Sequence, residues 1–198
     1  MALLTPRAPA HPDLIVVGGV PGAGKSTVIR GTAALPRVRV LDPDQLRSWL
    51  RSHLPARVPY RAYRPVVHVG HTLRVLAALL AGPASGHRLV VHDPATRSRR
   101  RTVLVRLARF RGWTPALVYV DIDRVSARRG QVERGRVVCA SSFEGHWRRW
   151  ERLRPRLVSD LATATRGGFS TVDLVGRDQA AAVLRQRLGV SRETELTS

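Results

Sequence analysis

Residues 19–27 are Gly19-Val20-Pro21-Gly22-Ala23-Gly24-Lys25-Ser26-Thr27. Their spacing matches G-x-x-x-x-G-K-[ST], a loop whose glycines let successive backbone N–H groups turn inward around phosphate oxygens. The apolar run 14–17 precedes the loop and a helix-compatible segment follows it, which is the context that such a loop needs. We therefore expect this segment to bind nucleotide phosphates, with the positive end of the following helix adding to the attraction.

Lys25 is the only lysine of the chain. Lysine and arginine together number 34, so arginine supplies the other 33 basic residues. A flexible ammonium stands at the one position where the planar guanidinium of arginine is a poor substitute. In the predicted loop Lys25 reaches the β- and γ-phosphates, and the hydroxyl of Ser26 binds Mg²⁺. The alternative is a glycine-rich turn without a ligand, which the agreement of spacing and context disfavours.

Composition sets further limits on this chain of 198 residues, which is long enough for one domain. The net charge of +20 points to a polyanionic partner such as nucleic acid, but arginine is scattered over the whole chain, so compositional bias explains the charge equally well. The single cysteine, Cys139, excludes an intramolecular disulfide and a cysteine-based metal cluster. No apolar run is long enough for a membrane span and no signal peptide is evident, so we expect a cytoplasmic protein without a membrane partner.

Short apolar runs alternate with longer helix-compatible segments. The runs lie at 14–18, 38–41, 89–92, 116–120 and 169–175, and the predicted helices at 25–34, 44–53, 65–81, 97–111, 123–133, 142–165 and 177–188. Continuous valine-rich runs are typical of strands buried on both faces of a parallel sheet, which predicts an α/β domain with right-handed crossovers. The expected organisation is a disordered tail over 1–12, one domain over 13–188 and a C-terminal tail over 189–198. The proline- and tyrosine-containing segment 54–64 is predicted to be a loop near the site.

Ligands of open parallel sheets bind beyond the carboxyl ends of the strands. The strand ends therefore supply the site candidates. These are residues 19–26, Asp42 and Asp44, His92 and Asp93, and Asp121 and Asp123. Acidic residues number only 14, so their concentration at these positions is informative.

The second run leads into Asp44 and, one helical turn later, Arg47. A carboxylate here faces the γ-phosphate from the acceptor side, where a general base collects a hydroxyl proton. Arg47 lies on the same helix face and is placed to hold an acceptor phosphate or the transferring group. The alternative for Asp44, and the favoured interpretation for Asp42, is a helix N-cap.

The third run ends at His92 and Asp93. An aspartate that ends a buried strand beside such a loop commonly holds Mg²⁺, and we assign that role to Asp93 against a turn-forming role before Pro94. We expect His92 to be a packed strand residue. Of the arginines at 97 and 99–101, most are expected to form a solvated face, and one is placed to reach acceptor phosphate.

After the fourth run, residues 126–136 predict a helix that breaks into a glycine-hinged basic loop. Such a loop can close over ATP, exclude water and bring arginine to the charge developing on the transferred phosphoryl group, with Arg129, Arg134 and Arg136 as candidates. A solvated helix end is the alternative. Further on, Phe143, Trp147 and Trp150 lie at helical spacing, and core packing is favoured over stacking on bases.

The P-loop, Asp44-Gln45-Leu46-Arg47, Asp93 and the basic segment with Arg129, Arg134, Gly135 and Arg136 resemble the P-loop kinases related to 5′-hydroxyl polynucleotide kinases and zeta-toxin-type kinases, often labelled AAA-family ATPases. The resemblance spans about residues 13 to 188. It implies a three-layer P-loop NTPase with a five-stranded parallel sheet and an arginine-rich lid, which uses ATP and Mg²⁺.

In this resemblance Asp44 is the general base, Arg47 contacts the acceptor phosphate, and the lid arginines contact the transition state. The implied activity is transfer of the γ-phosphate of ATP to a hydroxyl acceptor, with a nucleic-acid 5′-hydroxyl slightly ahead. The segment Asp42-Pro43-Asp44 and the tyrosines Tyr60 and Tyr63 are similar to zeta-type kinases, so a small-molecule or nucleotide-sugar acceptor stays open. An ATPase switch without group transfer and a nucleic-acid binder that uses ATP only structurally are further alternatives.

Overall fold

The five apolar runs form one parallel sheet in the order β2-β3-β1-β4-β5. The computed structural model describes residues 12–133, 139–159 and 168–190. The strands are β1 (Leu14–Gly19), β2 (Val38–Leu41), β3 (Arg88–His92), β4 (Pro115–Val120) and β5 (Thr171–Val175). The expected α/β class and the five-stranded parallel sheet are confirmed. The expected tails lie mostly outside the described residues.

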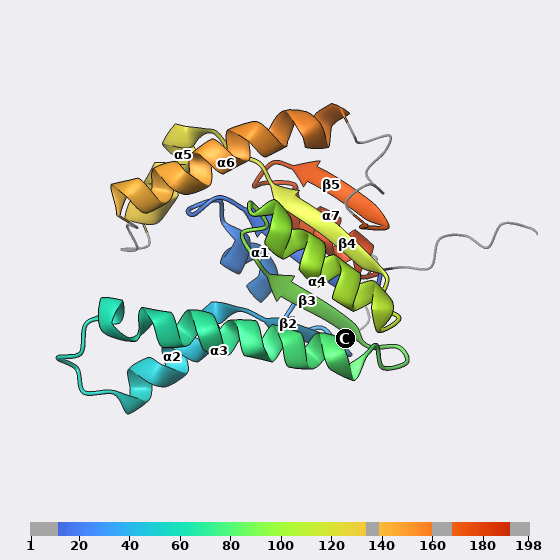
Figure 1. Cartoon of the computed structure of the whole chain (residues 1–198), viewed down its shortest axis with the longest axis horizontal. Coiled ribbons are helices and arrows are strands. Elements are labelled where there is room, and N and C mark those ends of the chain that lie inside the picture. The colour runs from blue at the N-terminus through green and yellow to red at the C-terminus, as the bar shows by residue number, and fades with distance from the viewer. Residues whose placement is uncertain (1–11, 134–138, 160–167, 191–198) are drawn as a thin grey trace, which may run out of the picture.

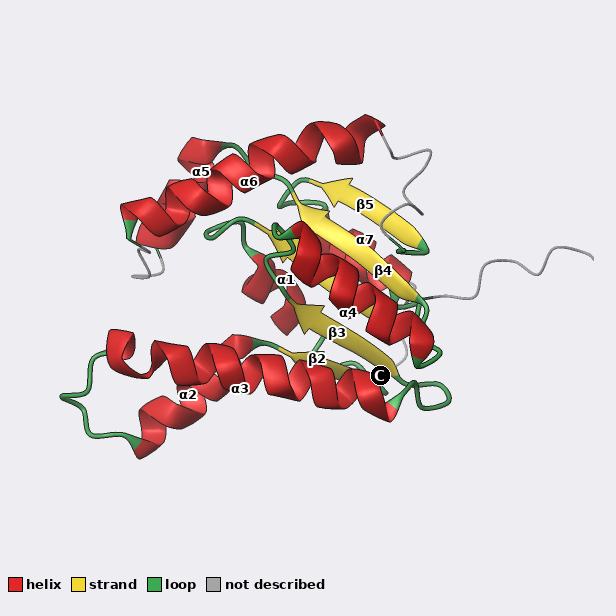
Figure 2. Ribbon diagram, viewed as in Figure 1, coloured by secondary structure: helices red, strands yellow, loops and turns green. Residues whose placement is uncertain are grey.

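Helices cover both faces of the sheet, as Figures 1 and 2 show. They are α1 (Lys25–Arg30), α2 (Pro43–His53), α3 (Tyr60–Ala81), α4 (Ser98–Phe110), α5 (Arg124–Val132), α6 (Ala140–Ser159) and α7 (Ala180–Arg187). α1 and α7 pack on one face, and α3 and α4 on the other. β1 pairs with β3 on one side and β4 on the other, which places Val16 beside both Val91 and Leu117. Every residue of β1 and β4 is buried, because both strands have neighbours in the sheet and helices above and below.

The start of α3 corrects the sequence prediction. Residues 54–64 were expected to form a loop, but α3 begins at Tyr60 and continues through Pro65. A proline inside a helix costs on the order of 3 kcal/mol. Tyr63 and Val67 lie on either side of it and are both buried, and each such side chain contributes about 1.5–3 kcal/mol. Burial of this continuous helix face therefore outweighs the lost backbone hydrogen bond.

Several other helix ends differ from the prediction by one to four residues. α1 ends at Arg30 rather than at residue 34, because Gly31 forms its C-cap. α6 extends over Ala140–Ser159, and the predicted continuation to residue 165 lies outside the described residues. None of the described helices combines the length and apolar character that crossing a membrane requires.

The aromatic residues of α6 pack into the core, as expected. Phe143 and Trp150 are buried, and the Trp150 ring stacks on Tyr119 of β4 with a centroid distance of 4.1 Å. This contact holds α6 beside the strand that precedes α5. The carboxyl ends of the strands lie on the side of the molecule that is flanked by the α2–α3 pair and the α5–α6 pair (Figure 1).

Candidate active site

The loop between β1 and α1 has backbone angles that favour glycine. Gly22 has a φ of 88° and Gly24 a φ of 100°, both in the left-handed region. Inside the loop, the buried Lys25 ammonium donates hydrogen bonds to the carbonyl oxygens of Gly19 at 2.7 Å and Val20 at 2.9 Å. The only ammonium of a lysine side chain in this protein is thus directed into the loop that the sequence predicts to hold phosphate.

Helix α5 packs directly against this loop through two glycines. A Cβ atom on Gly22 would lie 1.9 Å from the carbonyl oxygen of Ala127, and one on Gly130 would lie 2.5 Å from the carbonyl oxygen of Gly22. Arg177, which follows β5, bridges the two elements, because its Nη2 donates to the oxygen of Gly22 at 2.8 Å and to that of Ser126 at 3.4 Å. Gly130 therefore serves close packing within a helix, and Gly135 lies outside the described residues.

Asp42 connects the P-loop to the second and third strands. Its Oδ1 accepts the backbone N–H of Asp44 at 2.8 Å and lies 3.1 Å from Nδ1 of His92. Gln45 completes a capping box at the same helix end, so the N-cap role expected of Asp42 is confirmed. The hydroxyl of Ser26 also helps to lower the pKa of this carboxylate, a pairing that the sequence reasoning missed.

The electrostatics of Asp42 follow from these contacts. Burial alone would raise the pKa of Asp42, but the hydrogen bond and charge of His92, the N–H of Asp44 and the Ser26 hydroxyl together lower it to about 2. Asp42 is therefore an ionised carboxylate, only 4% exposed, beside the P-loop serine at neutral pH. His92 packs at the strand end as expected, and its contact with Asp42 gives it a second role.

Asp93 is also buried, but its two oxygens have other partners. Oδ1 accepts the backbone N–H of Ala95 at 2.7 Å, and Oδ2 pairs with Nε of Arg100 at 2.8 Å. The turn-forming role that the sequence offered as an alternative for Asp93 is therefore present. Its predicted contact with Mg²⁺ would have to compete with these two partners.

Asp44 and Arg47 lie in the first two turns of α2 and are both half-buried. The guanidinium of Arg47 lies over the ring of Tyr60, 4.5 Å from its centroid, and Tyr60 meets Tyr63 edge to face at 5.3 Å. The aromatic start of α3 thus holds Arg47 beside the end of β2.

The remaining predicted residues separate into three groups. Arg129 is an exposed residue of α5, and Arg134 and Arg136 lie outside the described residues. At the fourth strand end, Asp121 pairs with Arg154 at 2.8 Å and Asp123 caps α5 through the N–H of Ser126. These last two carboxylates, like Asp42 and Asp93, have structural partners.

Sequence reasoning missed His146 and Arg149 on α6. Nδ1 of His146 lies 3.3 Å from the hydroxyl of Thr96, in the loop that follows β3. The Nε atom of Arg149 is buried and has no hydrogen-bond partner within the described part of the chain. Their spacing of three residues places both on one helix face, but only the path of α6 across the strand ends reveals which face meets the site.

Comparisons with known proteins agree with this geometry. The sequence matches a family model described as an AAA domain over residues 14–158. No curated protein matches the sequence. Solved structures do match, at identities that show the fold alone.

One similar structure comes from the PezAT chromosomal toxin–antitoxin system of Streptococcus pneumoniae, with 16% identity over 90% of this chain and 77% of that chain and a TM-score of 0.56. Another is Kti12 of Chaetomium thermophilum in complex with ADP-AlF3, with 20% identity over 89% and 95% of the two chains and a TM-score of 0.55. A third is an unliganded sugar kinase from a Janibacter species, with 15% identity over 92% and 97% and a TM-score of 0.54.

Proposed function

Because the chain belongs to the AAA domain family and has a P-loop kinase fold, we propose that it is an ATP-dependent phosphotransferase that moves the γ-phosphate of ATP to a hydroxyl group. The observation that carries the proposal is the meeting of three features at one sheet edge. The P-loop directs Lys25 inward, Asp42 is a buried carboxylate that caps the next helix beside Ser26, and that helix opens with Asp44 and Arg47. Simple hydrolysis would not require the last pair.

Residues 19–27 would hold the phosphates of ATP through their backbone N–H groups, with the Lys25 ammonium between the β- and γ-phosphates. Lys25 now donates to two loop carbonyls, so it lies within the cradle that these phosphates would fill. The complex of the Kti12 structure with ADP-AlF3 supports a nucleotide in a fold of this kind.

The donor set beside the P-loop fits Mg²⁺. Hard oxygen ligands are what this ion prefers, and the P-loop offers the Ser26 hydroxyl beside Asp42, whose pKa that hydroxyl helps to lower. We infer that Ser26 ligates the ion and that Asp42 orients the serine. Asp93 is the carboxylate that the sequence proposes as a ligand. It would first have to release the N–H of Ala95 or the guanidinium of Arg100. When bound, the metal neutralises charge on the β- and γ-phosphates.

The transfer step then assigns a role to each remaining residue. The acceptor oxygen attacks the γ-phosphorus, the bond from that phosphorus to the bridging oxygen breaks, and ADP leaves. Asp44 accepts the proton of the acceptor hydroxyl, and Arg47 orients the acceptor. The basic segment with Arg129, Arg134 and Arg136 would supply the cation that stabilises the transferring phosphoryl group.

A nucleotide-sugar or other small-molecule acceptor is the second candidate within this activity. The contact of Arg47 with Tyr60, and of Tyr60 with Tyr63, favours it, because a cation beside two aromatic rings can hold a small ring-containing phosphate ester. An acceptor with a nucleic-acid 5′-hydroxyl would use the same base and the same P-loop.

Transfer of radiolabelled γ-phosphate to a panel of 5′-hydroxyl oligonucleotides, nucleosides, sugars and sugar nucleotides tests the proposal. Labelling of one class identifies the acceptor. ATP hydrolysis without any labelled acceptor would favour an ATPase switch and overturn the kinase proposal. Binding of nucleic acid that falls steeply with salt, in a protein without any ATP turnover, would favour the binding protein.

A further inference from the structure

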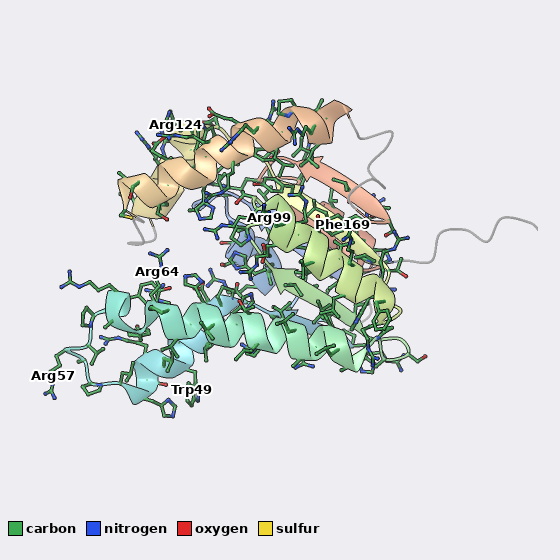
Figure 3. All side chains as sticks on the ribbon, viewed as in Figure 1. Trp49, Arg57, Arg64, Arg99, Arg124 and Phe169 are labelled. Carbon is green, nitrogen blue, oxygen red and sulfur yellow. The ribbon has the colours of Figure 1, made fainter. Side chains whose placement is uncertain are left out.

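Cationic side chains from three separate helices act on His146, whose ring meets Thr96 in the loop after β3. Arg149 belongs to α6, Arg97 is the N-cap of α4, and Arg64 lies in the second turn of α3. Figure 3 shows Arg64 extending from α3 toward the side on which α6 lies. His146 of α6 lies among these residues, and we call Arg97, His146 and Arg149 the α6 cluster.

One hydrogen bond fixes the position of this cluster. His146 Nδ1 lies 3.3 Å from the hydroxyl of Thr96, which is buried in the loop after β3. The same loop contacts the P-loop, because the N–H of Gly19 donates to the carbonyl oxygen of Pro94 at 3.3 Å. The cluster therefore lies at the strand ends, next to the predicted phosphate cradle, and not on a distant surface.

The charges that act most strongly on His146 are positive. Burial contributes most to lowering the pKa of His146, which falls to about 4, and nearby cations lower it further. In order of effect these cations are Arg149 of α6, Lys25 of α1, Arg97 of α4 and Arg64 of α3. At neutral pH the imidazole of His146 is therefore uncharged, while the four neighbouring side chains carry positive charge.

The arginines of the cluster differ from their neighbours in lacking acidic partners. Arg100 pairs with Asp93, and Arg154 pairs with Asp121. Within the described residues, no carboxylate forms an ion pair with Arg97 or Arg149. The buried Nε of Arg149 also lacks a hydrogen-bond partner there. Holding like charges together costs free energy, and a bound anion would offset that cost.

We propose that Arg97, His146 and Arg149 form an anion site for a phosphate group of the acceptor, and that the site takes up a proton when it is filled. The inference rests on the proposed function for the identity of the acceptor, but the anion site itself does not depend on catalysis. An anion site of this kind implies that the acceptor is an alcohol that also carries a phosphate group. A nucleoside monophosphate and an oligonucleotide share this chemistry.

The direction of the proton uptake follows from the charges. A phosphate group placed against His146 favours the imidazolium form, so the pKa of His146 rises on binding. Between the pKa of the empty site, about 4, and the higher pKa of the filled site, binding takes up a proton. His146 therefore contributes more to the affinity for the anion as the pH falls through this window, while the phosphate itself loses charge below its second pKa of about 6.

Isothermal titration calorimetry of the full chain tests the site. The protein is first saturated with ADP and Mg²⁺, so that the P-loop is filled, and is then titrated with a nucleoside 3′-monophosphate. The nucleoside without phosphate is the uncharged control, and a 5′-hydroxyl octanucleotide distinguishes nucleic acid from a small acceptor. We expect binding of the monophosphate and none of the nucleoside, with tighter binding of the octanucleotide only where the acceptor is nucleic acid.

Matched variants distinguish the effect of the α6 cluster on binding from the effect of the overall positive charge of the protein. Arg149→Gln and Arg97→Gln should each weaken the monophosphate at least tenfold. Arg148→Gln and Arg99→Gln remove the same charge from exposed neighbours and should change affinity less than twofold. Arg149→Lys keeps the charge and should keep most of the affinity. An equal loss in Arg149→Gln and Arg148→Gln would overturn the proposal.

Titrations at pH 5.5 in buffers of different ionisation enthalpy measure the proton. The phosphate of the ligand has a second pKa of about 6 and exchanges protons in every variant, so we expect greater uptake in the wild-type protein than in His146→Gln. Equal uptake in the two proteins would contradict the role of His146. If the monophosphate does not bind but labelled phosphate is still transferred to an uncharged acceptor, the anion site is wrong and the kinase stands. If the monophosphate binds through the cluster and no acceptor is ever labelled, the site stands and the kinase is wrong.

Discussion

Replacing Gly130 by alanine tests how α5 meets the P-loop. Inside an ordinary helix this change is stabilising by about 1 kcal/mol, because alanine has the higher helix propensity. At Gly130 the new Cβ would lie 2.5 Å from the backbone oxygen of Gly22 and 2.9 Å from Nη2 of Arg177. The first neighbour is backbone and cannot move aside alone. Overpacking of this kind costs about 1–3 kcal/mol.

The expected net effect of Gly130→Ala is therefore a loss of stability on the order of 1 kcal/mol. A displaced Gly22 carbonyl should also weaken ADP binding. Gly145→Ala in α6 is the matched control, since its Cβ would make only an ordinary contact, 3.5 Å from the Arg149 guanidinium. That variant should gain about 0.5–1 kcal/mol. Urea unfolding followed by tryptophan fluorescence measures both, and calorimetry measures ADP. Equal stabilisation of the two variants, with ADP affinity unchanged in Gly130→Ala, would refute the packing described for α5.

Two further substitutions test the P-loop and its carboxylate. Asp42→Asn keeps an acceptor for the N–H of Asp44 but removes the negative charge. The lowering of the pKa of Asp42 from 3.8 to about 2 corresponds to about 2 kcal/mol of folding stability. Urea unfolding at pH 7 should show that the variant has lost this free energy. The wild-type advantage should be complete above pH 3.8 and shrink as the pH falls toward 2. An advantage that is absent at pH 7 would argue against the hydrogen bond between Asp42 and His92. Lys25→Gln should weaken ATP binding about 10- to 100-fold in calorimetry, because a hydrogen bond to a charged group contributes about 1.5–3 kcal/mol; unchanged affinity would remove Lys25 from the phosphate site.

The sequence predicts the sheet well because its evidence is local. Continuous apolar runs such as 14–18 mark strands buried on both faces, and the P-loop spacing places a phosphate-binding loop and then a helix after the first strand. The start of α3 was mispredicted for the opposite reason. Pro59 and Pro65 are local signals against a helix, whereas burial of Tyr63 and Val67 is a tertiary effect that a local pattern does not contain.

The candidate site was predictable to the level of strand ends but not of individual contacts. Asp42 and Asp93 both follow strands that end at the same sheet edge, so the sequence places them alike. The contact of Asp42 with His92, and the ion pair between Asp93 and Arg100, depend on how the side chains are oriented after the strands end. His146 was invisible as a site residue, because its neighbour Thr96 is distant in the chain and only the path of α6 brings them together.

Single-turnover transfer of the γ-phosphate from radiolabelled ATP, compared between the wild-type protein and Asp44→Asn on whichever acceptor the panel identifies, tests the phosphotransferase most directly. Asp178→Asn, an exposed carboxylate before α7, is the charge-matched control. We expect Asp44→Asn to lower the transfer rate about 10²- to 10⁴-fold, the usual contribution of a general base, with ATP affinity unchanged and the control at the wild-type rate. Full transfer by Asp44→Asn would contradict the assignment of Asp44 as the base.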